Sequence, residues 1–230
     1  MQRNNKNTEL LALLEKCNYN LEDINYIKSN FGTDNSLCLL RQIYASLDLL
    51  EKDNNEYLAF YNLINRYFKL DCKVLDVCCG HLPILSDYIR RQQIKIGKGT
   101  VTSVDINLVV KLYGKINKLY KGTFDRKIIQ EHDLIISQAP CDKFDEIVGT
   151  SLEYNKGFFV SVCNCNNKTD YFPDNKDPFD DYDFDPVLSK IYSYINEIVK
   201  NQNLQYETID FDTRDGIRFV YGVPKKKILK

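Results

Sequence analysis

The first 70 residues repeat apolar positions at the three- and four-residue spacing of amphipathic helices. The pattern begins in NTELLALLEKC (7–17) and continues in LEDINYIKSNFG (21–32), SLCLLRQIYASLDLLEK (36–52) and NEYLAFYNLINRYFKL (55–70). The second of these segments follows Asn20, a suitable N-cap, and ends at Gly32, a suitable residue just beyond a helix. We therefore predict an N-terminal helical region over residues 1–70.

Short β-rich runs replace the helical period after residue 70. The runs are KVLDV (73–77), TVTSVDI (100–106), DLIIS (133–137) and GFFVSVC (157–163), and the segments between them have a helical pattern. Strands that alternate with helices predict a parallel sheet with helices on both faces. Residues 71–230 are therefore expected to form one α/β domain.

The C-terminal part of the chain has a different order. A helical pattern, VLSKIYSYINEIVKNQ, precedes two strand patterns, QYETIDFD and IRFVYGVPK, which are joined by TRDG. Asp215-Gly216 in this connection is a hairpin signal, so the last two strands should be antiparallel. The acidic, aromatic segment 170–186 is interrupted by prolines and predicts a surface loop.

Composition narrows the function classes. The chain has 230 residues, 43% of them hydrophobic, and a net charge of −1. It can bury one substantial core, and its overall charge gives no attraction to nucleic acid or a membrane. No secretory signal and no apolar run of membrane-spanning length is visible. Eight cysteines without an export signal indicate a reducing compartment, so a cytoplasmic protein without membrane association is expected.

Candidate chemistry lies at the strand ends, because open parallel sheets bind ligands beyond the carboxyl ends of their strands. Gly80 follows the first strand and would allow a ligand to approach the backbone closely. Asp105 ends the second strand, 25 residues after Gly80, where a carboxylate can accept the hydroxyl groups of a ribose. Asp105 could instead cap a helix that begins near Asn107. His81 is the histidine placed to act as a base at the edge of such a pocket.

These stretches resemble the motifs of one enzyme superfamily. VLDVCCGHLPIL resembles the first motif of the class I S-adenosylmethionine (SAM) dependent methyltransferases, SVDIN their ribose-binding acidic motif, and DLIISQAPC their fourth-strand motif. The resemblance covers roughly residues 73–224. It implies a Rossmann-like, seven-strand-type sheet that is mostly parallel with an antiparallel last strand. It also implies SAM as the cofactor, S-adenosylhomocysteine (SAH) as the product, and an unidentified methyl acceptor (RNA, protein or small molecule).

The resemblance assigns roles by position. It implies that Asp76 orients the turn, that Asp105 binds the ribose and that Ile106 packs on the adenine. The other residues that it places at the cofactor are Cys78, Cys79, Gly80, His81 and Gln138.

The sequence also departs from the superfamily's pattern. Cys78 and Leu82 replace the first and third glycines of the first motif, and Leu82 is expected to narrow the turn. The third strand should be short or missing, with KIIQ (127–130) as its candidate.

Three alternatives stay open at this point. Pro140-Cys141, followed by Cys163 and Cys165, resembles the cytosine-C5 RNA methyltransferases, in which a thiolate attacks the base, although Gln138 replaces their carboxylate. The protein could instead be a non-catalytic SAM-binding module that acts through its helical region. Cysteines at neighbouring strand ends could bind zinc or an iron–sulfur cluster, but buried thiols are expected rather than a metal site. The oligomeric state stays undetermined.

Overall fold

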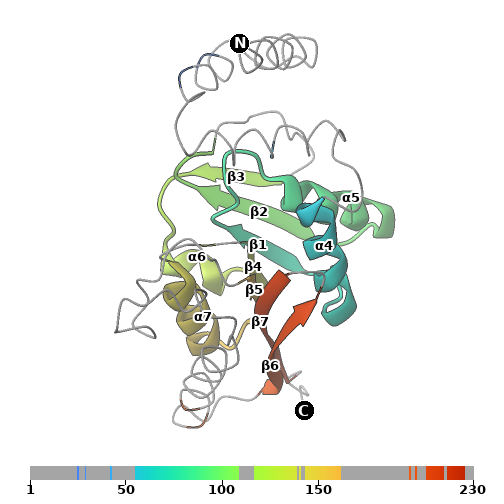
Figure 1. Cartoon of the computed structure of the whole chain (residues 1–230), viewed down its shortest axis with the longest axis vertical. Coiled ribbons are helices and arrows are strands. Elements are labelled where there is room, and N and C mark those ends of the chain that lie inside the picture. Colours follow the sequence, from blue (N-terminus) through green and yellow to red (C-terminus); the bar gives the residue numbers. More distant parts are fainter. Residues whose placement is uncertain are drawn as a thin grey trace, which may run out of the picture.

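The computed structural model describes residues 55–108, 117–138, 140, 143–161, 206–214 and 217–225, and isolated helical positions 25, 29, 42, 197 and 200. These ranges contain a seven-stranded sheet in the order β3-β2-β1-β4-β5-β7-β6 (Figure 1). The predictions for segments 7–17, 21–32, 36–52, 170–186 and 187–202 lie outside the described residues, apart from the isolated positions.

Strand directions confirm the predicted mixed sheet. The parallel strands are β1 (Lys73–Val77), β2 (Thr100–Asp105), β3 (Lys118–Lys121), β4 (Leu134–Ser137) and β5 (Gly157–Ser161). Strand β7 (Ile217–Pro224) runs antiparallel to both β5 and β6 (Tyr206–Arg214). The predicted parallel sheet and its antiparallel last strand are therefore both present.

Helices cover both faces of the sheet. Helices α4 (Glu56–Tyr67) and α5 (Ile84–Ile96) lie on one face, and α6 (Arg126–Gln130) and α7 (Phe144–Glu153) on the other (Figure 1). Helix α4 begins where the Asn55 side chain accepts a hydrogen bond from the Leu58 N–H, at 3.1 Å. Helix α5 ends at Gly97, whose φ of 70° is the left-handed conformation that glycine adopts freely.

Alternation along the strands builds two cores. In β1, Val74 packs with α4 and α5, whereas Leu75 and Val77 pack with α6 and α7. This is the period-two pattern of a sheet buried on both faces. Phe159 of β5 and Phe219 of β7 stack with ring centroids 4.5 Å apart on the α4 side. The sheet is therefore held between two apolar layers.

The third strand corrects one sequence-based candidate. A short third strand is present, as expected, but it is β3 at Lys118–Lys121, within a segment whose pattern predicted a helix. KIIQ (127–130) lies in α6 instead, after Asp125 accepts a hydrogen bond from the Lys127 N–H. Strand β3 is an edge strand whose side chains are mostly exposed, so it lacks the apolar run that marks the inner strands.

The sheet also engages a helix from the predicted N-terminal region. Phe60, Leu63 and Ile64 of α4 are fully buried in the same core as β1 and α5. The boundary that the sequence places near residue 70 stays a prediction. Among the described helices, none combines the length and apolar character needed to cross a membrane.

Candidate functional site

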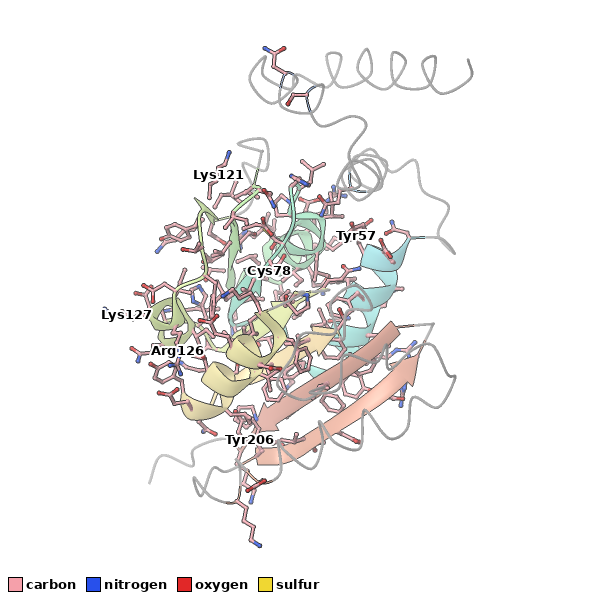
Figure 2. The ribbon with its side chains drawn as sticks, turned by 60° about the vertical axis from the view of Figure 1, so that its left-hand side comes forward. Tyr57, Cys78, Lys121, Arg126, Lys127 and Tyr206 are labelled. Atoms are coloured by element: carbon pink, nitrogen blue, oxygen red, sulfur yellow. The ribbon has the colours of Figure 1, made fainter. Side chains whose placement is uncertain are left out.

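The turn between β1 and α5 has an unusual backbone. Gly80 has a φ of 78°, and Cys78 has a φ of 57° although it carries a side chain. A left-handed conformation costs a side-chain-bearing residue about 1–2 kcal/mol. Cys78 therefore takes the conformation of the glycine that it replaces. Figure 2 shows it at the end of β1.

Asp105 joins the ends of β1 and β2. Its Oδ2 accepts a hydrogen bond from the Gly80 N–H at 2.8 Å, and its Oδ1 accepts one from the Asn107 N–H at 2.7 Å. The second bond is a contact within the turn after β2, and the helix that Asp105 could cap would lie outside the described residues. The first bond brings Asp105 to the glycine turn. A carboxylate has about four acceptor sites, so each oxygen keeps capacity for a further donor such as a hydroxyl group.

His81 and Ile106 lie beside this junction. His81 Nδ1 is 3.0 Å from the Asn107 carbonyl oxygen, so Nδ1–H donates this bond, and the ring is 7% exposed. Burial lowers the pKa of His81, which favours the neutral ring. Ile106 is 59% exposed, which leaves its side chain available to a flat apolar ligand. The turn residues thus offer polar groups on one side and an apolar surface on the other.

Asp76 lies under the turn. It is 1% exposed, and its Oδ2 accepts a hydrogen bond from Ser86 Oγ at 2.7 Å, while Ser103 Oγ donates to Ser86 Oγ at 2.7 Å. Its Oδ1 is buried without a hydrogen-bond partner among the described residues. Burial, opposed by the hydrogen bond from Ser86 and reinforced by the nearby charge of Asp105, raises the pKa of Asp76 to about 7. Asp76 therefore links the end of β1 to α5 through its hydrogen bond with Ser86.

Cys79 is a buried thiol at the turn. Burial, followed by the charges of Asp76 and Asp105, raises the pKa of Cys79 well above its usual value. Within the described ranges, no three His, Cys, Asp or Glu side chains come together as metal ligands. Cys141, Cys163 and Cys165 lie outside the described residues, so the roles suggested for them stay predictions.

The end of β4 contributes the next part of the site. Ser137 Oγ donates a 2.6 Å hydrogen bond to the Val77 carbonyl, so the ends of β4 and β1 are tied together. Gln138 follows, and its Oε1 is buried without a partner among the described residues. The structure thus brings Asp76, Gly80, Asp105 and Gln138 to one edge of the sheet.

Gln42 is a residue that the sequence did not identify. Its side chain is buried against the turn, with Nε2 3.4 Å from the Cys79 carbonyl oxygen, while its Oε1 accepts a hydrogen bond from the Leu82 N–H at 3.1 Å. A polar residue within an apolar helical pattern carries no signal of a contact 37 to 40 residues away. The Leu82 side chain that was expected to narrow the turn is itself fully buried.

The geometry suits a nucleoside at one end of the site. Asp105 supplies acceptors for hydroxyl groups, and the exposed Ile106 supplies an apolar face for a base. At the other end, Gly80 has no side chain, but a Cβ added there would lie 2.1 Å from Gln42 Nε2. The residues present therefore fit the nucleoside part of a cofactor, and Gln42 covers the backbone beside it.

Known proteins resemble this chain in structure and not in sequence. No protein-family model and no curated protein sequence matches it. The CMeT domain of the citrinin polyketide synthase is similar at 10% identity and a TM-score of 0.46, with 84% of this chain and 57% of that domain covered.

Two further solved structures are similar. For the magnesium protoporphyrin IX methyltransferase of Synechocystis PCC 6803, solved with bound SAM, identity is 14% and the TM-score is 0.43, with 90% of this chain and 99% of that chain covered. For the B. subtilis m1A22 tRNA methyltransferase TrmK, identity is 8% and the TM-score is 0.37, with coverages of 71% and 64%.

The sheet itself supports the fold assignment. Its seven strands, mostly parallel and with an antiparallel β7, agree with the sheet that the resemblance to the class I methyltransferases implied. The chain therefore has the Rossmann-like fold of these enzymes.

Proposed function

We propose that this protein is a SAM-dependent methyltransferase. The observation that carries the proposal is the hydrogen bond between the Gly80 N–H and Asp105, because it brings the glycine turn and the acidic strand end together at the carboxyl edge of the sheet. In this site Asp105 would bind the ribose, Ile106 would pack on the adenine, and the backbone from Cys78 to His81 would face the methionine part. SAM, when bound, supplies a methyl group on a positively charged sulfur.

The protein's own contribution would be mainly positioning. Holding an acceptor in line with the methyl group supplies much of the rate enhancement in a reaction between two bound molecules. His81 is the candidate base, since burial lowers the pKa of its ring and so favours the neutral form that a general base requires. Gln138, whose buried Oε1 lacks a partner among the described residues, is placed to accept a hydrogen bond from the acceptor molecule.

A non-catalytic SAM-binding module is the second candidate function. Two of the described titratable groups at the turn are buried: His81 is 7% exposed and Asp76 is 1% exposed. A binding protein could have this arrangement without an accessible base. The two functions differ in whether a methyl group leaves the cofactor.

Cofactor binding can be tested with SAH and two matched aspartate variants. Asp105→Ala removes the acceptors for the ribose and should weaken SAH binding at least tenfold by isothermal titration calorimetry. Asp133→Asn is the control, because Asp133 accepts a hydrogen bond from the Lys73 N–H at the opposite edge of the sheet and should leave the affinity unchanged. Equal affinity of SAH for the wild type and for Asp105→Ala would contradict the proposed site.

The acceptor class can be identified with SAM labelled on its methyl group. Wild-type protein is incubated with labelled SAM and cell extract, and the labelled products are sorted by their sensitivity to nuclease and protease. Transfer that is lost in Asp105→Ala and kept in Asp133→Asn would support an enzyme and indicate whether RNA, protein or a small molecule is modified. SAH binding without transfer would favour the non-catalytic module.

A further inference from the structure

Gln42 contacts the turn through both ends of its carboxamide. Nε2 faces the Cys79 carbonyl oxygen at 3.4 Å, and Oε1 accepts the Leu82 N–H at 3.1 Å. The side chain bridges the two residues that flank the Gly80-His81 pair, and Gln42 is 3% exposed. A polar group buried this deeply requires such partners, because an unsatisfied one costs about 1–3 kcal/mol.

Gly80 gives Gln42 the room to approach. A Cβ at Gly80 would lie 2.1 Å from Gln42 Nε2 and 3.0 Å from its Cδ, both too close for real atoms. A glycine in a cofactor turn serves to let a ligand approach the backbone closely. Here the group that approaches is Gln42.

The two backbone groups that Gln42 uses also suit an α-amino acid. A carboxamide presents one donor end and one acceptor end, and an amino-acid zwitterion presents an ammonium donor and a carboxylate acceptor. The Cys79 carbonyl could accept from the ammonium, and the Leu82 N–H could donate to the carboxylate. Both groups are engaged by Gln42 in this structure.

We infer that Gln42 occupies the position that the amino-acid end of the cofactor requires, so that it competes with SAM and SAH for the turn. The inference rests on the proposed cofactor. The nucleoside end is not affected, because Asp105 and Ile106 lie on the β2 side of the turn and keep acceptor capacity and exposed apolar surface. Cofactor binding therefore requires Gln42 to exchange its two contacts for those of the ligand.

The test compares Gln42→Ala with the wild type by calorimetry. Since two hydrogen bonds no longer have to be exchanged, SAH should bind roughly five- to tenfold more tightly to the variant. 5′-Methylthioadenosine has the nucleoside and the thioether but lacks the amino-acid end, so its affinity should stay the same. Melting of the ligand-free variant should occur at a lower temperature than that of the wild type, because the turn loses its partner.

Gln93→Ala is the matched control. Gln93 is a fully buried glutamine whose Nε2 donates to the carbonyls of Leu70 and Cys72 at the amino ends of the strands, at 2.9 and 3.0 Å. Its loss should lower the melting temperature and leave the affinity for SAH unchanged. Gln42→Asn, whose side chain is one methylene shorter, is the second variant to use if Gln42→Ala does not fold. It should also bind SAH more tightly than the wild type does.

The outcomes separate this inference from the proposed function. Binding of SAH to the wild type with equal or weaker binding to both Gln42 variants would overturn the inference, and Gln42 would then be a structural clamp of the turn. Equal tightening of SAH and 5′-methylthioadenosine would also overturn it. Binding by Gln42→Ala alone would support it. Binding by none of the proteins would overturn the proposed function and the inference with it.

Discussion

Asp76 shows how a single buried group couples the turn to pH. Its Oδ2 is bonded to Ser86, and Ser86 in turn to Ser103, so the carboxyl group is held by a short chain of hydroxyl groups between β1, α5 and β2. Burial raises its pKa from 3.8 to about 7 in the folded protein. Between these two values, folded Asp76 keeps a proton that the unfolded chain has released.

The contribution of Asp76 to the stability of the wild type should therefore fall as pH rises from about 4 to about 7, and level off above. The sign follows because the folded state binds more protons than the unfolded state in this window. Asp76→Asn has no carboxyl group at this position to titrate. The free energy of unfolding of this variant, relative to that of the wild type, should therefore rise by roughly a few kcal/mol as pH rises across the same window. Urea unfolding at pH 4, 5.5, 7 and 8 measures the difference. A difference that is constant with pH would contradict the raised pKa.

Cys78 gives a second residue-scale result. It takes a left-handed φ of 57° in the position of a glycine and packs against the α6–α7 core. Its contact with this core offsets a conformation that is unfavourable for any residue with a Cβ. The turn thus keeps the shape of a glycine turn with a single glycine, Gly80.

At the scale of elements, the pairing of β5 with β7 depends on a close approach of side chain to backbone. Gly222 of β7 faces Phe158 of β5, and a Cβ at Gly222 would lie 2.3 Å from Phe158 Cε1. Phe158 is fully buried and cannot move aside without disturbing the core. Strand β7 therefore needs a residue without a side chain at position 222, where it packs against the ring of Phe158.

Gly222→Ala should destabilise the protein by about 1–3 kcal/mol, the usual cost of overpacking a well-packed site. Gly149→Ala in α7 is the matched control, since a Cβ there meets nothing within 4 Å. That change should stabilise the protein by about 0.5–1 kcal/mol, because alanine is more favourable than glycine in the interior of a helix. Denaturant unfolding of both variants tests the prediction, which fails if Gly222→Ala is as stable as the wild type.

At the scale of the whole molecule, one sheet supports both cores and the candidate site. The α4–α5 core and the α6–α7 core share β1, β2, β4, β5 and β7, so loss of the sheet removes both. The candidate site lies at the carboxyl edge of the same strands. A ligand bound there should stabilise the described domain as a unit.

SAH at 100 times its dissociation constant should add about 2.7 kcal/mol of stability. For a chain of 230 residues this corresponds to a rise of about 5–10 °C in melting temperature. Far-ultraviolet circular dichroism and tyrosine absorbance should report the same shift. Gly222→Ala should melt earlier and show an equal shift, since Gly222 pairs with Phe158 near the amino end of β5. Different shifts from the two probes would contradict a single cooperative unit.

The sequence by itself determined the elements whose pattern is local. The apolar runs that begin at Lys73 and Gly157 became inner strands, the helical pattern between the first two strands became α5, and the last two strand patterns became an antiparallel pair. The same reasoning located Asp76, Gly80 and Asp105 at strand ends, because a parallel sheet brings those ends to one edge. Periodicity and strand order are properties that a short stretch of chain carries with it.

The tertiary structure alone decided the features that depend on a distant partner. Strand β3 exists because its backbone pairs with β2, although its own side chains are mostly exposed and have no strand-like apolar pattern. The pKa of Asp76 depends on burial beneath α5, and the position of Gln42 depends on a turn 37 to 40 residues further along the chain. The physical reason is the same for the strand, the pKa and the glutamine contact. Strand pairing, burial and side-chain hydrogen bonds all depend on which parts of the chain meet in the folded protein.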